Sequence, residues 1–317
     1  MVFSIMKSLC AATLLACASS VLPQVKATGS PDPLCSLPTA SLVAAAQQYP
    51  TLTSAINTVL NNSIAMWYTD NEAASSLETK LNQLVSHCPE NSRLMLVVYG
   101  LPNKDCEAGY SNLGSNKNAK DYKNFIEKLT KVVGKRKVLY VLEPDAVGLV
   151  ANGGCAVKEG YTDNVREASA IKIANAVKSL STVGRLKGIV LNSDNFRPTA
   201  DMATLCTTFQ NAYNSTALNC VVDTSRNYNN NPPSTEWCNS RFGGIGRPPT
   251  DKTGYSNLDY LIWIKPAGES DGTCDGSDRS PDAMVGPPAG QFFKEGFISL
   301  WNNGYYVQEK GFPAIAP

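Results

Sequence analysis

The chain contains a single histidine, His87, among its 317 residues. A Ser-His-Asp or Cys-His catalytic apparatus would have to use this residue. It lies beside Cys88 and Pro89 in a turn-like stretch, where a plain surface histidine is expected. After residue 20 no two cysteines have the C-x-x-C spacing, so the chain lacks the usual ligands of a zinc site. We therefore expect neither a metal nor a cofactor.

Net charge and long apolar runs are also scarce. The formal net charge is +1, which gives no electrostatic reason to expect nucleic acid or a membrane surface as a partner. Beyond the N-terminal residues, no run is long and apolar enough to span a bilayer. No internal repeat is visible. Neutral partners are expected.

Residues 1–20 resemble a secretory signal peptide, with Lys7 before an apolar core and small residues after it. Residues 21–37 are rich in Pro, Ser and Gly and are predicted to be a short leader, and residues 38–317 are predicted to form a single catalytic domain. After residue 20 an even number of cysteines remains, as expected for disulfides in a secreted, extracellular protein. Asn61 and Asn214 begin Asn-x-Ser/Thr sequons and are candidate glycosylation sites.

Apolar runs and helical periodicities alternate along the rest of the chain. The runs predict strands over residues 64–68, 93–99, 138–142, 186–191, 220–223 and 258–264. The periodicities predict helices over residues 41–60 (interrupted at Pro50), 72–87, 120–133, 163–180, 200–213 and 289–301. This order indicates one α/β domain built on a parallel sheet.

The stretch Val138–Gly148 is the clearest functional candidate. Val138–Leu142 is a short apolar run, typical of a strand buried on both faces, and Pro144 ends it. Asp145 then lies at the carboxyl end of a strand, where α/β barrels carry their active sites. A carboxyl walled by apolar side chains can hold a proton near neutral pH. An Asp after Pro and before Ala-Val-Gly is also typical of a helix N-cap, and this short stretch taken alone favours the cap.

Several long loops follow predicted strands and carry an acid near the strand end. These acids are Asp105, Asp145, Asp223 and Asp271. Because the carboxyl ends of parallel strands share one edge, these loops are expected to lie together, and loops of this length in a compact domain are usually functional.

Five stretches, in this order, resemble glycoside hydrolase family 6, the cellulases that include endoglucanases and cellobiohydrolases. They are Val97–Cys106, Leu142–Asp145, Val222–Asn227, Glu236–Asn239 and Trp263–Gly272. The resemblance covers about residues 38–306, and the chain is similar in style to secreted oomycete or fungal enzymes. It implies a distorted TIM-like parallel β/α barrel that acts as a monomer. The implied activity is hydrolysis of β-1,4-glucosidic bonds in cellulose or β-glucan, with inversion.

The resemblance also implies roles for particular residues. Asp145 matches the general acid that protonates the leaving oxygen, Asp105 an acid that supports it and helps the water, and Asp271 a proposed base. Ser111 matches a serine that positions the water, and Tyr99 a tyrosine near the distorted sugar. Inversion requires two carboxylates far enough apart to admit a water, which agrees with acids on separate loops.

Further residues match sugar contacts of the family, namely Trp67, Trp237, Lys265, Glu269, Arg226 and Asn195. Apolar sugar faces stack on aromatic rings, and sugar hydroxyls need polar partners. Structural alternatives remain open for some of them. Trp67 is also compatible with a place in the barrel core, and Arg226 with an ion pair to Asp223. Trp263 is expected to be core.

The resemblance further implies two disulfides, Cys106–Cys155 and Cys238–Cys274, each joining active-site loops. It assigns no partners to Cys35, Cys88, Cys206 and Cys220, for which Cys35–Cys88 and Cys206–Cys220 are only what remains.

The chain departs from the family pattern between Asp145 and the strand at residues 186–191. The family has an additional helix–strand unit there, and residues 152–162 are too few to hold one, since such a unit needs roughly thirty residues. We predict that this unit is missing near Gly160, which would leave an unpaired strand edge. A smaller departure is Lys104, where many relatives have arginine.

Two alternatives to a cellulase were considered. The missing unit suggests a non-catalytic glucan-binding or eliciting paralogue. The acidic loop Glu269–Asp278 suggests a calcium-binding domain, but its acid spacing fails the EF-hand pattern.

Overall fold

The structure is a computed structural model. It describes residues 32–105, 109, 112–144, 146, 171, 174–175, 177–178, 186–228, 236–276 and 279–316. Residues 32–317 form one compact unit. Within the described ranges, no helix has the length and apolar character needed to cross a membrane.

The strands form two parallel sheets, one of four strands and one of three. In the first, β3 is central and pairs with β1, β2 and β4; in the second, the order is β5-β6-β7. The strands are β1 (Leu34–Cys35), β2 (Met66–Thr69), β3 (Arg93–Tyr99), β4 (Val138–Leu142), β5 (Gly188–Leu191), β6 (Asn219–Asp223) and β7 (Leu258–Ile262). Because all of these pairings are parallel, the carboxyl ends within each sheet lie at one edge.

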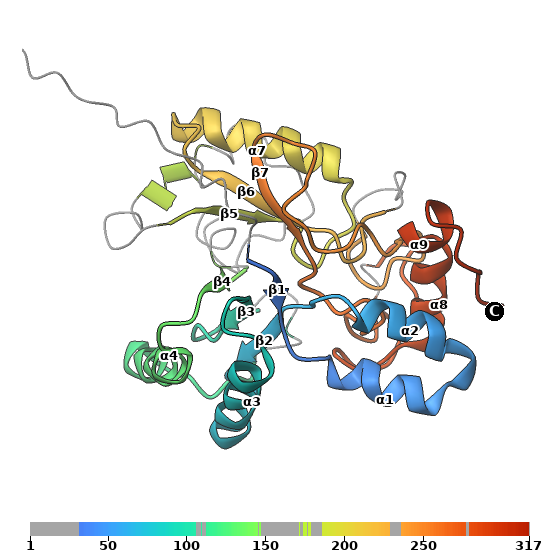
Figure 1. The fold of residues 1–317 in the computed structure, drawn as a ribbon, viewed down its shortest axis with the longest axis horizontal. Helices are drawn as coiled ribbons and strands as arrows, with labels where there is room; N and C mark the ends of the chain where they lie inside the picture. The colour runs from blue at the N-terminus through green and yellow to red at the C-terminus, as the bar shows by residue number, and fades with distance from the viewer. Residues whose placement is uncertain are drawn as a thin grey trace, which may run out of the picture. The chain divides into compact units, whose positions relative to one another are not determined.

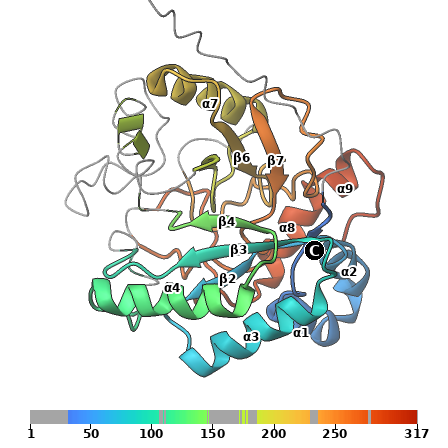
Figure 2. The ribbon, with the colours of Figure 1, turned by 60° about the vertical axis from the view of Figure 1, so that its left-hand side comes forward.

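Helices lie against one face of each sheet: α3 and α4 run beside β3, and α7 runs beside β6 and β7 (Figures 1 and 2). Apolar side chains of α3 and α4 share a buried cluster with β3, and those of α7 share one with β5, β6 and β7. The helices are α1 (Ala40–Gln48), the 3₁₀ helix η1 (Pro50–Leu52), α2 (Thr53–Leu60), α3 (Ala74–His87), α4 (Ala119–Val133), α7 (Thr199–Tyr213), α8 (Lys294–Asn302) and α9 (Tyr305–Gln308).

The two sheets share an interior. Met95, Val97 and Tyr99, which alternate along β3, belong to one buried cluster with Ile262 and Ile264. This alternation follows from the two-residue period of a strand, which points every second side chain to the same face. The residues of this cluster therefore pack between the two sheets, next to the carboxyl ends of β3 and β7.

One seam between the sheets is closed by backbone contacts. Ile64, just before β2, forms a parallel bridge with Trp263, just after β7. The Ala65 N–H donates to the Trp263 carbonyl at 2.8 Å. At the other seam, the described residues of β4 and β5 do not pair with each other. The described chain thus shows α/β architecture with two parallel sheets, and a closed TIM-like barrel stays a prediction. The predicted missing unit falls at residues 152–162, outside the described residues.

The expectation that β4 is buried on both faces is wrong. Val141, which faces the interior, is 1% exposed, whereas Tyr140 is 36% and Leu142 is 55% exposed. Alternate residues point to opposite faces. On the face opposite Val141, only Val138 packs against the cluster formed with α3 and α4, and Tyr140 and Leu142 are exposed.

The remaining predicted elements agree in type with the structure and differ at their ends. The strand predicted at residues 64–68 is β2, and the one predicted at 258–264 ends at Ile262. The helix predicted from residue 289 begins at Lys294. Most of the helix predicted over residues 163–180 lies outside the described residues.

Candidate active site

Aromatic and charged side chains gather after β2 and β3. The Trp67 indole N–H donates to the Ile264 carbonyl at 2.9 Å, and its ring meets the Tyr99 ring edge-on with centroids 5.6 Å apart. The Lys104 ammonium lies 5.4 Å from the Tyr99 ring centroid and is paired with Asp70. Trp67 is thus tied to the segment after β7. It is half-buried and packs against the interior cluster, which agrees with the alternative of a place near the core.

The turn after β3 is fixed by Glu143. Its carboxylate accepts backbone N–H groups of Gly100 at 2.9 Å and of Leu101 at 3.2 Å. Burial raises the pKa of Glu143, while these amides oppose that rise. Asn103 and Asp105 follow with φ of 62° and 54°, a conformation that Asn and Asp tolerate better than most residues. Glu143 therefore holds the backbone that carries Asp105.

Asp145 and Ser111, together with Cys106 and Cys155, lie outside the described residues. The backbone flanking Asp145 is described: the Ala146 N–H donates to the Glu143 carbonyl at 2.9 Å. Glu143, itself at φ 46°, precedes Pro144 and ends the strand. The Glu143 carbonyl and the Ala146 N–H are thus brought together directly after β4.

Asp271 is buried in a cluster of positive charge. Arg226 Nη1 donates to both of its carboxylate oxygens, at 2.8 and 2.7 Å, and Lys265 Nζ lies 3.1 Å from Oδ1. The Asn239 N–H donates to Oδ2 at 2.8 Å. Burial raises the pKa of Asp271, but Arg226 and Lys265 outweigh it and hold that pKa below its ordinary value. Asp271 is therefore ionised, and its cationic neighbours repel a calcium ion.

Arg226 is positioned from three sides. It is 2% exposed, its guanidinium carbon lies 4.2 Å from the Phe196 ring centroid, and it donates to the Asp194 carbonyl. The alternative in which Arg226 pairs with Asp223 is wrong, because the guanidinium reaches across to Asp271 instead.

Lys265 and Glu269 follow β7 and are largely buried. Burial lowers the pKa of Lys265, but Asp271 and other nearby acids raise it above the ordinary value. Burial raises the pKa of Glu269, against the opposing effect of Lys265. The Ser41 hydroxyl donates to Glu269 Oε1 at 2.5 Å. This end of the sheet therefore offers one stable cation and one carboxyl that takes up a proton more readily than a free glutamate.

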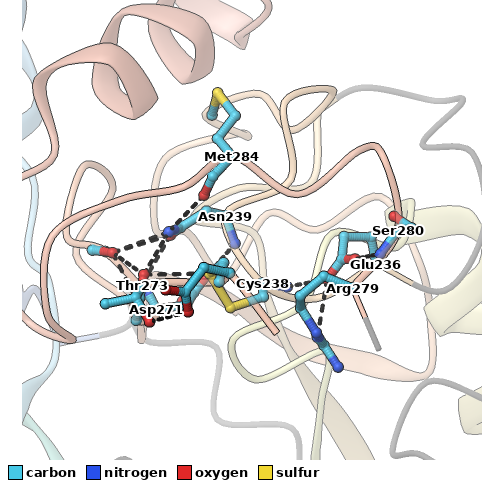
Figure 3. Close-up of a disulfide and its surroundings, with 12 residues drawn as sticks. Glu236, Cys238, Asn239, Asp271, Thr273, Arg279, Ser280 and Met284 are labelled. Carbon is cyan, nitrogen blue, oxygen red and sulfur yellow. Dashed lines mark hydrogen bonds and ion pairs between the residues drawn. A yellow bond between two sulfur atoms is a disulfide. The ribbon is translucent and has the colours of Figure 1, made fainter. Parts of the chain in front are cut away.

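The loop that bears Trp237 is joined to the loop that bears Asp271. A disulfide links Cys238 and Cys274, as the resemblance implies (Figure 3). The Asn239 side chain donates to Gly272 at 2.9 Å and to Met284 at 3.2 Å, and accepts the Asp271 N–H at 2.8 Å. Asn239 was missed as a functional residue, although it lies within one of the motifs that carry the resemblance.

Trp237 itself stacks on a cation. The Arg279 guanidinium carbon lies 4.8 Å from the Trp237 ring centroid, and Arg279 Nη1 is 3.1 Å from Glu236 Oε1. Glu236 also accepts the N–H groups of Cys238 and Ser280 (Figure 3). Trp237 therefore belongs to a turn that several hydrogen bonds hold. Trp263, by contrast, is fully buried, as expected for a core residue.

Asn195, Asn61 and Asn214 are further predicted residues that the structure describes. Asn195 lies after β5, and its Oδ1 accepts the Phe196 N–H at 2.8 Å. Asn61 and Asn214 are exposed at the ends of α2 and α7. Two more disulfides join Cys35 to Cys88 and Cys206 to Cys220.

Asp223 is a further buried acid at the end of β6. Burial raises its pKa to about 6, with the nearby Asp194 raising it and the Ser225 N–H opposing. From the sequence, Asp223 was predicted only to be an acid near the end of a strand, and no role was assigned to it. Chemically, the site presents aromatic rings, cations, and carboxyls whose pKa values are shifted in opposite directions, which suits a neutral, hydroxyl-rich ligand and proton transfer.

The chain matches the family model described as Glycosyl hydrolases family 6 over residues 36–185 and 160–304, two segments that overlap. Endoglucanase A of Cellulomonas fimi is 30% identical over 227 residues, which are 66% of this chain and 47% of that protein. Endoglucanase A of Thermobispora bispora is 30% identical over 202 residues, 56% of this chain and 44% of that protein. The chain spans about half the length of these two relatives.

A longer match is the 1,4-beta-D-glucan cellobiohydrolase CEL6C of Podospora anserina, 27% identical over 323 residues that cover 80% of each chain. Among solved structures, the GH6 enzyme of Orpinomyces sp. Y102 superposes with a TM-score of 0.69 at 22% identity, covering 86% of this chain and 97% of that one. The endoglucanase Cel6 of Mycobacterium tuberculosis, in complex with a methyl-cellobiosyl-4-deoxy-4-thio-β-D-cellobioside, gives a TM-score of 0.66 at 24% identity with the same coverage. At these identities the structures show a shared fold.

Proposed function

This chain belongs to glycosyl hydrolases family 6, and from that membership we propose that it hydrolyses β-1,4-glucosidic bonds in cellulose or a soluble β-glucan. The substrate is a polysaccharide bound along the strand-end edge. Relatives named endoglucanase and cellobiohydrolase support this substrate class.

The observation that carries the proposal is the contact of two cations, Arg226 and Lys265, with the carboxylate of Asp271. A carboxylate held by Arg226 and Lys265, with its pKa lowered, cannot give a proton to a leaving oxygen. The proton donor must be another acid, and we assign this role to Asp145. Its place directly after strand β4, beside the turn at Glu143, supports the assignment.

The roles of the other residues follow from this assignment of Asp145 as the proton donor. Asp105 supports Asp145 and helps the water, which Ser111 positions on the opposite face of the sugar ring with Tyr99 nearby. Asp271, ionised at neutral pH, stabilises positive charge that develops on the sugar and serves as the candidate base. An acid and a base on separate loops leave room for a water and give inversion.

Sugar binding is assigned to the rings of Trp67 and Trp237 and to the polar groups of Lys265, Glu269, Arg226 and Asn195. Support comes from the firm anchoring of both indoles. The Cys238–Cys274 disulfide joins the Trp237 loop to the Asp271 loop.

The protein is proposed to be secreted as a monomer, with residues 1–20 removed, residues 21–37 as a leader and residues 38–317 as one catalytic domain. Three disulfides among the described residues and two exposed sequons support an oxidising export route. The overlap of the two family-model matches at residues 160–185 supports a chain with one helix–strand unit fewer than the family.

The test measures reducing sugar released from soluble β-glucan by the unmodified protein and by Asp145→Asn, with Asp251→Asn as a control. Asp251 is an exposed acid outside the helices and strands. The proposal requires activity in the unmodified protein and in Asp251→Asn, and its loss in Asp145→Asn. Binding of cellulose without any turnover by the unmodified protein would contradict it.

A further inference from the structure

Asp223 is a buried carboxyl to which the proposed chemistry gives no task. It ends β6 and is 1% exposed. A carboxyl taken out of water is unfavourable unless polar groups compensate it. Its partners therefore indicate what it does.

Three backbone amides converge on this one carboxylate. The Ser225 N–H donates to Oδ1 at 2.9 Å, and the Ile264 N–H donates to the same oxygen at 3.2 Å. The Asp194 N–H donates to Oδ2 at 3.3 Å. These donors belong to segments that follow three neighbouring strands, β6, β7 and β5, so a single side chain joins the carboxyl ends of the whole second sheet.

Each segment delivers a group to the Asp271 cluster. Ser225 is followed by Arg226, and Ile264 is followed by Lys265; both cations contact Asp271. The Asp194 carbonyl accepts from Arg226 Nη2 and so fixes the other arm of the guanidinium.

We propose that Asp223 is a positioning residue of the active site, whose carboxylate holds the ends of β5, β6 and β7 so that Arg226 and Lys265 converge on Asp271. Its effect on hydrolysis rests on the function proposed above. The backbone contacts themselves do not depend on that function.

The contacts require a good hydrogen-bond acceptor, which is the ionised carboxylate. The charged groups around Asp223 are Asp194 after β5, Arg226 after β6, and Lys265 and Asp271 after β7. With a pKa raised by burial to about 6, Asp223 takes up a proton in mildly acidic solution, and Oδ2 then ceases to be a free acceptor for the Asp194 N–H. Positioning should therefore weaken as the pH falls through about 6.

The first test is hydrogen–deuterium exchange of peptides that cover residues 193–197, 224–227 and 263–266. In Asp223→Ala these amides should exchange at least about tenfold faster than in the unmodified protein, as expected for the loss of a protecting hydrogen bond. Asp223→Asn keeps one acceptor oxygen but turns an amide NH₂ toward Asp194, so its effect should concentrate in residues 193–197. Asp251→Asn should leave all three peptides unchanged. This exchange test does not require the protein to be active.

The second test is kcat/KM on soluble β-glucan between pH 4.5 and pH 8. The unmodified protein should lose activity on the acid side around pH 6. Asp223→Asn should be about tenfold to a hundredfold less active at pH 7, the cost of a small misplacement of binding groups, and should lack this acid-side loss. If the unmodified protein is inactive at every pH, the proposed function fails while the exchange result still decides the positioning role.

Should Asp223→Ala not fold, Asp223→Asn decides both tests. Unchanged exchange in residues 193–197, or an unchanged pH profile in an active Asp223→Asn variant, would overturn the inference.

Discussion

Arg226 Nη1 contacts both carboxylate oxygens of Asp271, at 2.8 and 2.7 Å, although the two residues are 45 positions apart in the chain. Both side chains are almost fully buried. A buried ion pair of this kind contributes little net stability when intact, but removing one partner leaves an uncompensated charge. Asp271 thereby depends on Arg226 for its ionised state.

Removal of Arg226 should therefore be costly. We expect Arg226→Met to lower the free energy of unfolding at pH 7 by about 3–5 kcal/mol, since Asp271 keeps only Lys265 as a cationic partner. Arg226→Lys, which keeps a charge without the planar donor group, should cost less. Urea unfolding of the three proteins measures this, and equal stability of Arg226→Met and the unmodified protein would contradict it.

The contribution of Asp271 should also depend on pH in a defined direction. Its folded-state pKa lies below the ordinary value, so its contribution to stability is present above about pH 4 and is lost as the pH falls through the folded-state pKa. The unfolding free energies of Asp271→Asn and the unmodified protein should accordingly converge as the solution is acidified toward pH 3.

The contribution of Asp223 to stability should depend on pH in the opposite direction. Its folded-state pKa of about 6 lies above the ordinary value of 3.8, so its contribution to stability is full below that ordinary value and is lost as the pH rises through 6. Between pH 4 and pH 7.5, the stability of Asp223→Asn relative to the unmodified protein should rise by roughly 2–3 kcal/mol. Urea unfolding at the two pH values checks this, and a constant difference would show that Asp223 has an ordinary pKa.

Two disulfides provide a matched comparison. Cys238 and Cys274 are 36 residues apart and join loops of the site, whereas Cys35 and Cys88 are 53 residues apart and lie away from it. Replacing either pair by serine should cost about 3–4 kcal/mol of stability through the unfolded state. Only Cys238→Ser with Cys274→Ser should also lower kcat/KM, by about tenfold or more, because the Trp237 and Asp271 loops lose their link. Equal kinetic effects of the two double variants would refute a role for this link in the site.

Trp263 and Trp237 allow a core residue to be compared with a predicted sugar contact. Trp263 is fully buried, and its indole donates to the Arg247 carbonyl at 3.0 Å, so Trp263→Ala should destabilise the fold by about 3–5 kcal/mol. Trp237 is half-buried on a turn, and Trp237→Ala should change stability little while raising KM for glucan about tenfold, the equivalent of one lost ring contact. Thermal unfolding and steady-state kinetics distinguish these outcomes, and an unchanged KM in Trp237→Ala would remove this residue from the binding surface.

The helices and strands were predictable because short-range patterns of apolar residues determine them. The apolar run at residues 93–99 and the helical spacing at 120–133 identify β3 and α4. The positions of acids at strand ends likewise follow from the order of elements along the chain.

The partners of those acids were not predictable from pattern alone. Arg226 has Asp223 three residues away in sequence, yet the strand end turns its side chain toward Asp271. Asn239 and Glu143 act by hydrogen bonds to distant backbone amides, which leave no periodic signal. Exposure of Tyr140 and Leu142 on β4 depends on what packs against that strand, which its own sequence does not encode.

The most direct test of the account compares two substrates in Asp145→Asn. General acid catalysis contributes typically 10²–10⁴-fold to a rate, and it is needed only when the leaving group requires a proton. The account predicts a loss of this size on soluble β-glucan, with hydrolysis of 2,4-dinitrophenyl β-cellobioside, whose leaving group needs no proton, reduced far less. An equal loss on both substrates, or no loss on either, would contradict the assignment of Asp145 as the proton donor.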